Sequence, residues 1–155
     1  MSANSEDVRE HDRMVNALFN DKSVLQHALN LQTVFIRGKE YQFDPMSDER
    51  ADLVFQDRWN PYKGDTEAVL FVVELKSDEM DHEGLGQLKK AVDALEKTGK
   101  AIKHWGQVRG VAIARRYTTS GLQLLKDAGY SALLWSEPDG VRLTSAQKHA
   151  ASKIM

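Results

Sequence analysis

The chain has 155 residues, of which 41% are hydrophobic, and this suits one domain with a hydrophobic core. It contains no cysteine, which excludes disulfides, thiolate zinc sites and cysteine nucleophiles. The formal net charge of -2 hides an asymmetry, since residues 1–83 carry -9 and residues 84–155 carry +7. No apolar run approaches a membrane span, and the polar, acidic start does not resemble a secretory signal. We therefore expect a single domain over residues 1–155, without a membrane segment and located in the cytoplasm.

The first half of the chain predicts helices followed by antiparallel strands. Apolar residues at helical spacing indicate an amphipathic helix from Ser5 to about Phe19, with Ser5 as its N-cap, and another helical turn or two over residues 24–31. The triplet Arg37-Gly38-Lys39 predicts a short hairpin between two strands. The strands are expected, in chain order, over residues 33–36, 40–43, 51–56 and 67–76. Short turns join these strands, so we expect them to pair antiparallel.

The second half of the chain predicts strands that alternate with helices. Gly99 should end a first helix, Thr118 or Thr119 should cap a second, and Gly129 should close the second. Alternating elements of this kind predict parallel strands with right-handed crossovers, and hence an α/β fold with a mixed central β-sheet flanked by helices on both faces. The expected elements are helices over 84–97 and about 119–128, strands over 108–114 and 131–135, a turn at 138–140, a returning strand over 141–143 and a terminal helix over 145–153.

Charged residues interrupt a buried strand where that strand ends. The apolar run Val69-Leu70-Phe71-Val72-Val73 is followed by Glu74, Leu75 and Lys76. Because side chains alternate along a strand, Glu74 and Lys76 share one face. If the two strands form an antiparallel pair, Asp52 at the start of the preceding strand lies beside Glu74. The pattern thus predicts two acids and one amine at a common edge.

Two carboxylates and a backbone carbonyl suit Mg²⁺, which prefers oxygen ligands and retains several waters. We expect Asp52, Glu74 and the carbonyl of Leu75 to hold the metal. A magnesium-activated water can then attack a phosphodiester bond, and Lys76 can position that water and offset charge on the phosphate. The same residue types also occur as a solvated ion pair at a strand end, so the spacing alone leaves both interpretations open.

Four short segments follow one another along the chain: Arg50-Ala51-Asp52-Leu53-Val54-Phe55, Val72-Val73-Glu74-Leu75-Lys76, Gly86-Gln87-Leu88 and residues 108–114. As an ordered set, they resemble the PD-(D/E)XK nuclease superfamily. The closest similarity is to the catalytic domain of NucS/EndoMS-type endonucleases, over roughly Glu10 to Trp135. The resemblance implies a restriction-endonuclease-like fold, a magnesium or manganese cofactor and a DNA substrate. It implies metal and catalytic roles for Asp52, Glu74 and Lys76, and a site-lining role for Gln87.

Other candidates each have a plain structural alternative. An acid on the first helix often completes the metal site in this superfamily, and Glu10 is preferred over Glu6, although either fits a solvated helix start equally well. DNA contacts are expected from the basic pairs Arg115/Arg116 and Lys89/Lys90, which also suit surface salt bridges or a solvated face. Trp59 and Tyr62 could stack on bases, or pack within their own connection.

The best-supported function is a metal-dependent DNA endonuclease. The first alternative is a catalytically inactive binding module that keeps the nuclease fold. The second is a nuclease subunit whose DNA specificity comes from a partner protein. A self-sufficient enzyme that cuts duplex DNA would often be a homodimer.

Overall fold

The computed structural model describes residues 5–43, 49–57, 68–102, 105–137 and 139–147, in which helices and strands follow the order expected of a mixed α/β fold. The helices are α1 (Ser5–Asn20), α2 (Ser23–Ala28), α3 (His82–Ile102) and α4 (Thr119–Ala128). The strands are β1 (Phe35–Gln42), β2 (Arg50–Gln56), β3 (Val69–Leu75), β4 (Glu79–Met80), β5 (Gln107–Ala114), β6 (Arg116–Tyr117), β7 (Ser131–Ser136) and β8 (Arg142–Ser145). No helix in these ranges is long and apolar enough to cross a membrane.

A six-stranded sheet in the order β1-β2-β3-β5-β7-β8 forms the centre of the structure. Strands β1, β2 and β3 pair antiparallel, β3, β5 and β7 pair parallel, and β8 returns antiparallel to β7. This arrangement confirms the expected mixed sheet. The carboxyl ends of the three parallel strands meet the start of β2 at one edge of the sheet, and the candidate site lies there.

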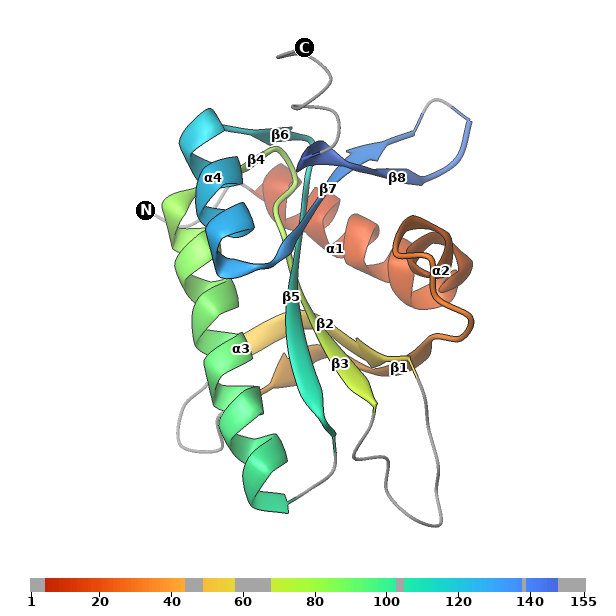
Figure 1. Cartoon of the computed structure of the whole chain (residues 1–155). Helices are drawn as coiled ribbons and strands as arrows, with labels where there is room; N and C mark the ends of the chain where they lie inside the picture. Colours follow the sequence, from red (N-terminus) through yellow and green to blue (C-terminus); the bar gives the residue numbers. More distant parts are fainter. Residues whose placement is uncertain (1–4, 44–48, 58–67, 103–104, 138, 148–155) are drawn as a thin grey trace.

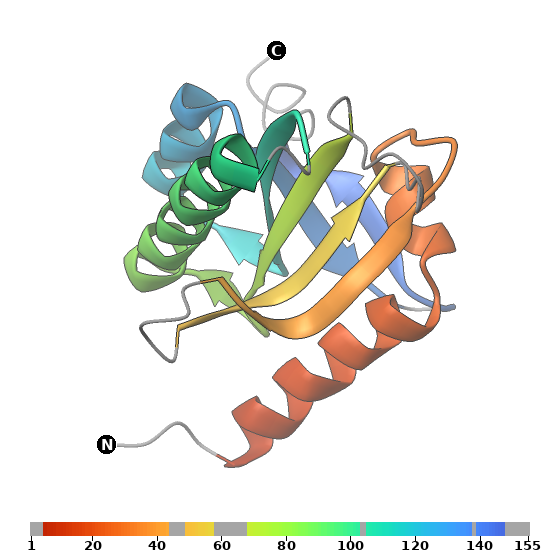
Figure 2. The ribbon, with the colours of Figure 1, turned by 90° about the horizontal axis from the view of Figure 1, so that it is seen from below.

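Two helical layers cover the sheet, with α1 and α2 on one face and α3 and α4 on the other (Figure 1, Figure 2). On the α1 face, Met14 and Leu18 pack against strand residues such as Phe71 and Ile113. On the α3 face, Leu88, Val92 and Leu95 pack against alternate positions such as Val72 and Ala112. The central strands are buried from both sides, which explains their nearly continuous apolar sequences.

The hairpin expected at Arg37-Gly38-Lys39 is not formed. These residues lie inside the single strand β1, whose register against β2 shifts between Ile36 and Gly38. A glycine within a strand commonly marks such a bulge, and here the chain bends without turning back. Glu40, two residues later, has a φ of +49°, a left-handed conformation within the same irregular stretch.

Gly99 does not end α3, which continues to Ile102. A Cβ atom on Gly99 would clash with Nε1 of Trp105, so this glycine leaves space for a buried tryptophan. By contrast, α4 follows its sequence signals. Thr118 accepts a hydrogen bond from the backbone N–H of Gly121, and Gly129 has a left-handed φ of +77°. Ser145 ends β8, residues 146 and 147 are helical, and the rest of the expected terminal helix lies outside the described residues.

Candidate active site

The strand register brings Asp52 and Glu74 to one place. Leu53 of β2 pairs with Val73 of β3, and one step further along this antiparallel pair Asp52 comes opposite Glu74. There the backbone ladder gives way to a side-chain contact, since the N–H of Leu75 donates to Oδ2 of Asp52 at 2.7 Å. The Asp52 carboxylate thus lies against the last residues of β3.

A histidine on α1 holds the other oxygen of Asp52. Nε2 of His11 lies 3.1 Å from Oδ1 of Asp52, and the hydrogen bond raises the pKa of the imidazole because it favours the charged form. Sequence reasoning missed His11. The available signal was its position, because His11 stands three, four and seven residues before Met14, Val15 and Leu18, on the buried face of the helix.

Glu74 is a buried carboxylate, with only 9% of its surface exposed. Burial, and after it the negative charge of Asp52, raise the pKa of Glu74 to about 8, although Lys76 acts to lower it. Among the described residues its nearest cation is Lys76, 4.0 Å away, and no hydrogen-bond donor reaches its carboxylate. A cation bound jointly by Glu74 and Asp52 would stabilise such a group.

Lys76 directly follows β3 and faces the N-terminus of α3. Its Nζ lies 4.0 Å from Oε1 of Glu74 and 3.9 Å from Oδ1 of Asp81. The same Asp81 oxygen caps α3 by accepting the N–H of Gly84 at 2.7 Å. A Cβ atom on Gly84 would lie 2.8 Å from Cε of Lys76, so this glycine lets the helix approach the lysine closely.

Gln87 lies one helical turn after Gly84 and is half-buried on α3, beside the stripe that packs on the sheet. Leu75 is buried between Glu74 and Lys76, with its N–H bound to Asp52. These positions place Gln87 and Leu75 on elements that adjoin Asp52, Glu74 and Lys76.

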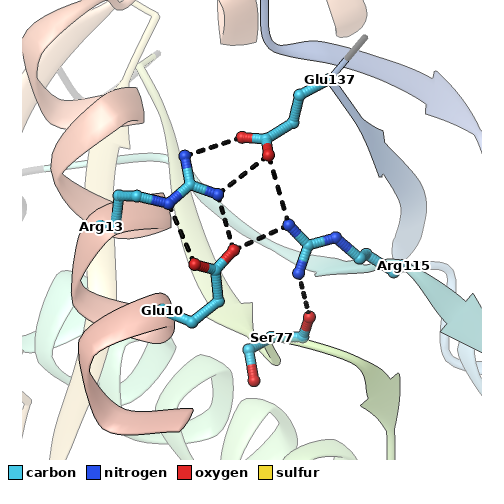
Figure 3. Close-up of polar contacts among 5 residues, drawn as sticks. All are labelled: Glu10, Arg13, Ser77, Arg115 and Glu137. Atoms are coloured by element: carbon cyan, nitrogen blue, oxygen red, sulfur yellow. Dashed lines mark hydrogen bonds and ion pairs between the residues drawn. The ribbon is translucent and has the colours of Figure 1, made fainter. Parts of the chain in front are cut away.

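Glu10, expected as the metal ligand from the first helix, lies in an ion-pair network instead (Figure 3). Its carboxylate contacts Arg13 at 2.6 Å and Arg115 at 2.8 Å, and these arginines lower the pKa of Glu10 to about 2. Among the described residues, no three His, Asp or Glu side chains gather closely enough to share a metal ion. Glu10 therefore does not join Asp52 and Glu74, and the α1 residue that reaches Asp52 is His11.

The expected DNA-contacting residues fall into different settings. Arg115 is half-buried in the Glu10 network, whereas Arg116 is exposed and forms two hydrogen bonds with Asp78, at 2.9 and 2.7 Å. On α3, Lys89 is exposed and Lys90 pairs with Glu49 at 2.7 Å. Trp59 and Tyr62, and the rest of the connection between β2 and β3 from 58 to 67, lie outside the described residues.

A small cavity of about 130 Å³ adjoins Asp52 between α1 and the β1–β2 pair. His11 and Asp52 line it together with Asn16 and Lys39, whose side chains hydrogen-bond at 2.7 Å. Asp52 is therefore bordered by this cavity as well as by the end of β3.

The donor set fits a hard divalent cation. Asp52 and Glu74 would each supply one carboxylate, and Leu75, whose N–H contacts Asp52, would supply its backbone carbonyl. Mg²⁺ commonly takes one or two carboxylates from a protein and completes its shell with water or substrate oxygens. Three protein acids are therefore not required.

Neither a family profile nor a curated protein matches the sequence. Among solved structures, the chain resembles a repair endonuclease from Pyrococcus abyssi, with a TM-score of 0.58 and 19% identity over 89% of this chain and 49% of that one. It also resembles EndoMS in a complex with dsDNA, with a TM-score of 0.57 and 19% identity over 85% of this chain and 45% of that one. Its similarity to EndoMS in the apo form has a TM-score of 0.52 and 16% identity over 90% of this chain and 49% of that one. The chain has the fold of these endonucleases. It spans about half the length of each.

Proposed function

We propose that this chain is a metal-dependent nuclease that hydrolyses phosphodiester bonds in DNA. The observation that carries the proposal is the buried Glu74 carboxylate beside Asp52 at the edge of a nuclease-like sheet. A carboxylate kept in that setting without a hydrogen-bond donor among the described residues costs folding free energy, and a bound cation offsets that cost.

Each residue at the edge has a distinct part in this proposal. Asp52, Glu74 and the carbonyl of Leu75 would hold Mg²⁺ or Mn²⁺. The metal, when bound, would supply an acidified water and neutralise charge on the phosphate. Lys76 lies 4.0 Å from Glu74, where its ammonium can orient the attacking water and stabilise charge that develops on the phosphate. Gln87 would add a hydrogen bond to substrate or water from α3.

DNA is the proposed substrate because one structural neighbour is EndoMS in a dsDNA complex. We propose phosphate contacts from Arg116 and from Lys89 and Lys90 on α3, all of which are exposed. Trp59 and Tyr62 remain candidates for base stacking. Because the chain spans about half of its neighbours, a homodimer or a partner protein would complete the DNA-binding surface.

The proposal is tested by a cleavage panel of single-stranded, duplex, mismatched and branched DNA with Mg²⁺, Mn²⁺ or EDTA. We expect metal-dependent cleavage that falls by at least about a hundredfold in Glu74→Gln and Asp52→Asn, the scale of loss when a charged catalytic group is removed. Asp127→Asn on the outer face of α4 is the matched control and should cut normally. Cleavage that persists unchanged in Glu74→Gln would overturn the proposal.

A second function, an inactive nucleic-acid-binding module, is favoured by one observation. Both oxygens of Asp52 already have partners, Leu75 N–H and His11 Nε2. If these contacts exclude a metal, wild type and Glu74→Gln bind DNA equally in Mg²⁺ and in EDTA, and neither cleaves it. Cleavage by wild type in Mg²⁺ rules this alternative out.

A further inference from the structure

Four charged side chains form a network beside the candidate site (Figure 3). Arg13 contacts Glu10 at 2.6 Å and Glu137 at 2.8 Å. Arg115 contacts the same two acids at 2.8 and 3.4 Å. Each guanidinium therefore bridges both carboxylates, and the formal charges of the network cancel.

The network joins segments that are distant in sequence. Glu10 and Arg13 come from α1, Arg115 follows β5, and Glu137 follows β7. Arg115 also donates from Nη1 to the carbonyl of Ser77 at 2.6 Å, directly after Lys76. One set of contacts thus connects the first helix to the carboxyl ends of all three parallel strands.

His11 lies between Glu10 and Arg13 on the same helical turn. An α-helix is rigid over one turn, so contacts that fix residues 10 and 13 also fix the position of residue 11. His11 is the α1 residue that contacts Asp52. We propose that Glu10, Arg13, Arg115 and Glu137 are positioning residues that hold α1 and the Lys76 segment against each other, so that His11 stays on Asp52. The proposal rests on the proposed nuclease function.

The rival explanation is a phosphate-binding site made by the two arginines. The acids argue against it, because the pKa values of Glu10 and Glu137 are both lowered by hydrogen bonding to Arg13, which keeps them charged at neutral pH. Two adjacent carboxylates would repel an incoming phosphate. A balanced network between fixed elements suits positioning better than anion capture.

Replacement of an acid distinguishes the two explanations, because a positioning network predicts a lower kcat whereas a phosphate site predicts a lower KM. We expect Glu137→Gln and Arg13→Gln each to lower kcat about tenfold, because small displacements of a catalytic constellation are costly, with KM for DNA changed less than about twofold. The double variant should be no worse than the poorer single variant, since both break the same network. Arg13→Lys should recover part of the loss. Arg109→Gln, at the opposite end of β5, is the control.

A phosphate site predicts instead that Glu137→Gln lowers KM and leaves kcat unchanged, and this result would overturn the proposal. Unchanged kcat and KM in both single variants would also overturn it. Additive losses in the double variant would show that the residues act separately, which contradicts a single network.

Hydrogen exchange provides a readout that does not require activity. In Arg13→Gln we expect the amides of α1 to exchange about threefold faster or more, the scale set by partly exposed ion pairs, while those of α4 are unchanged. Unchanged α1 exchange would refute the network even if wild type cleaves DNA. If α1 exchanges faster but the wild type never cleaves DNA, the network does hold α1 in place, but the nuclease proposal and the catalytic role of the network are both wrong.

Discussion

Ionisation of the Glu74 carboxylate costs free energy, because β3 buries it and Asp52 places a like charge nearby. In the proposed nuclease, this carboxylate would bind a proton in the metal-free protein and a cation once metal is present. Proton and metal therefore compete for one group, and metal affinity should increase as the pH rises towards about 8, where Glu74 loses its proton.

The stability of the metal-free protein should reflect the same group. The folded-state pKa of Glu74, about 8, lies above its ordinary value of 4.5. Its contribution is thus fully present below 4.5 and is lost as the pH rises through about 8, because the folded state then has to ionise a buried acid. We expect Glu74→Gln to gain Tm relative to wild type across this range in EDTA.

The measurement is a series of thermal melts by circular dichroism at several pH values, with exposed Asp127→Asn as the control. The control should follow wild type throughout. Parallel wild-type and Glu74→Gln curves would contradict the assigned burial of this carboxylate.

A pair of glycines in α3 tests how Lys76 is placed. A Cβ on Gly84 would lie 2.7 Å from Sδ of Met80 and 2.8 Å from Cε of Lys76, whereas one on Gly86 meets no atom within 4 Å. We expect Gly84→Ala to lower kcat about tenfold by displacing the lysine. Gly86→Ala should keep full activity and gain up to about 1 kcal/mol of stability, since alanine favours a helix. Equal kcat for the two variants would show that the close approach is unimportant.

Sequence reasoning brought Asp52, Glu74 and Lys76 to one edge because strand alternation and register follow simple periodicities. It placed the first-helix acid at Glu10, although the helix turns His11 towards Asp52. Both residues lie near the start of α1. Successive residues point about 100° apart around a helix axis, so the one that faces Asp52 depends on how the helix packs on the sheet. Periodicity from Met14 and Leu18 could have identified His11. Pairing of Arg13 with Glu137 depends on tertiary contacts and could not have been foreseen.

At the scale of elements, α1 must stay packed on the sheet if His11 is to reach Asp52. Leu18 is 1% exposed in the α1 face of the core, whereas Leu124 on α4 is 50% exposed. We expect Leu18→Ala to lower the free energy of unfolding by about 2 to 5 kcal/mol, and Leu124→Ala to change it by less than about 0.5 kcal/mol. Urea denaturation of both variants is the measurement. Equal losses would show that α1 is not part of the core.

Two glycines explain where the predicted elements were wrong. Gly38 suggested a turn and Gly99 a helix end, because glycine is common at both. In the structure, Gly38 lies at a bulge in β1. Gly99 lies within α3, where the absence of a side chain leaves space for the ring of Trp105. The sequence does not distinguish a glycine needed for backbone freedom from one needed for space, since the partner lies elsewhere in the chain.

At the scale of the whole molecule, the strand order follows from the alternation of elements. Helices α3 and α4 lie between parallel strands, whereas the sequence predicts no helix between the antiparallel strands β1, β2 and β3, so the mixed sheet could be predicted without knowledge of any contact. The sequence likewise predicted a returning strand after residue 140, and β8 does pair antiparallel with β7 at the sheet edge.

We propose that residues 1–155 form one folding unit, because both faces of a single sheet are covered by the two helical layers. Thermal unfolding should then follow one transition, with coincident curves from circular dichroism and tryptophan fluorescence. Two separated transitions would contradict a single unit.

The central claim is that Asp52 and Glu74 share a divalent cation, and Mn²⁺ binding measured by electron paramagnetic resonance tests it most directly. We expect wild type to bind Mn²⁺ with an affinity that increases as the pH approaches about 8, where Glu74 ionises. Glu74→Gln and Asp52→Asn should each weaken binding by more than about tenfold, whereas Asp127→Asn should match wild type. Equal Mn²⁺ affinity in wild type and Glu74→Gln would contradict the account.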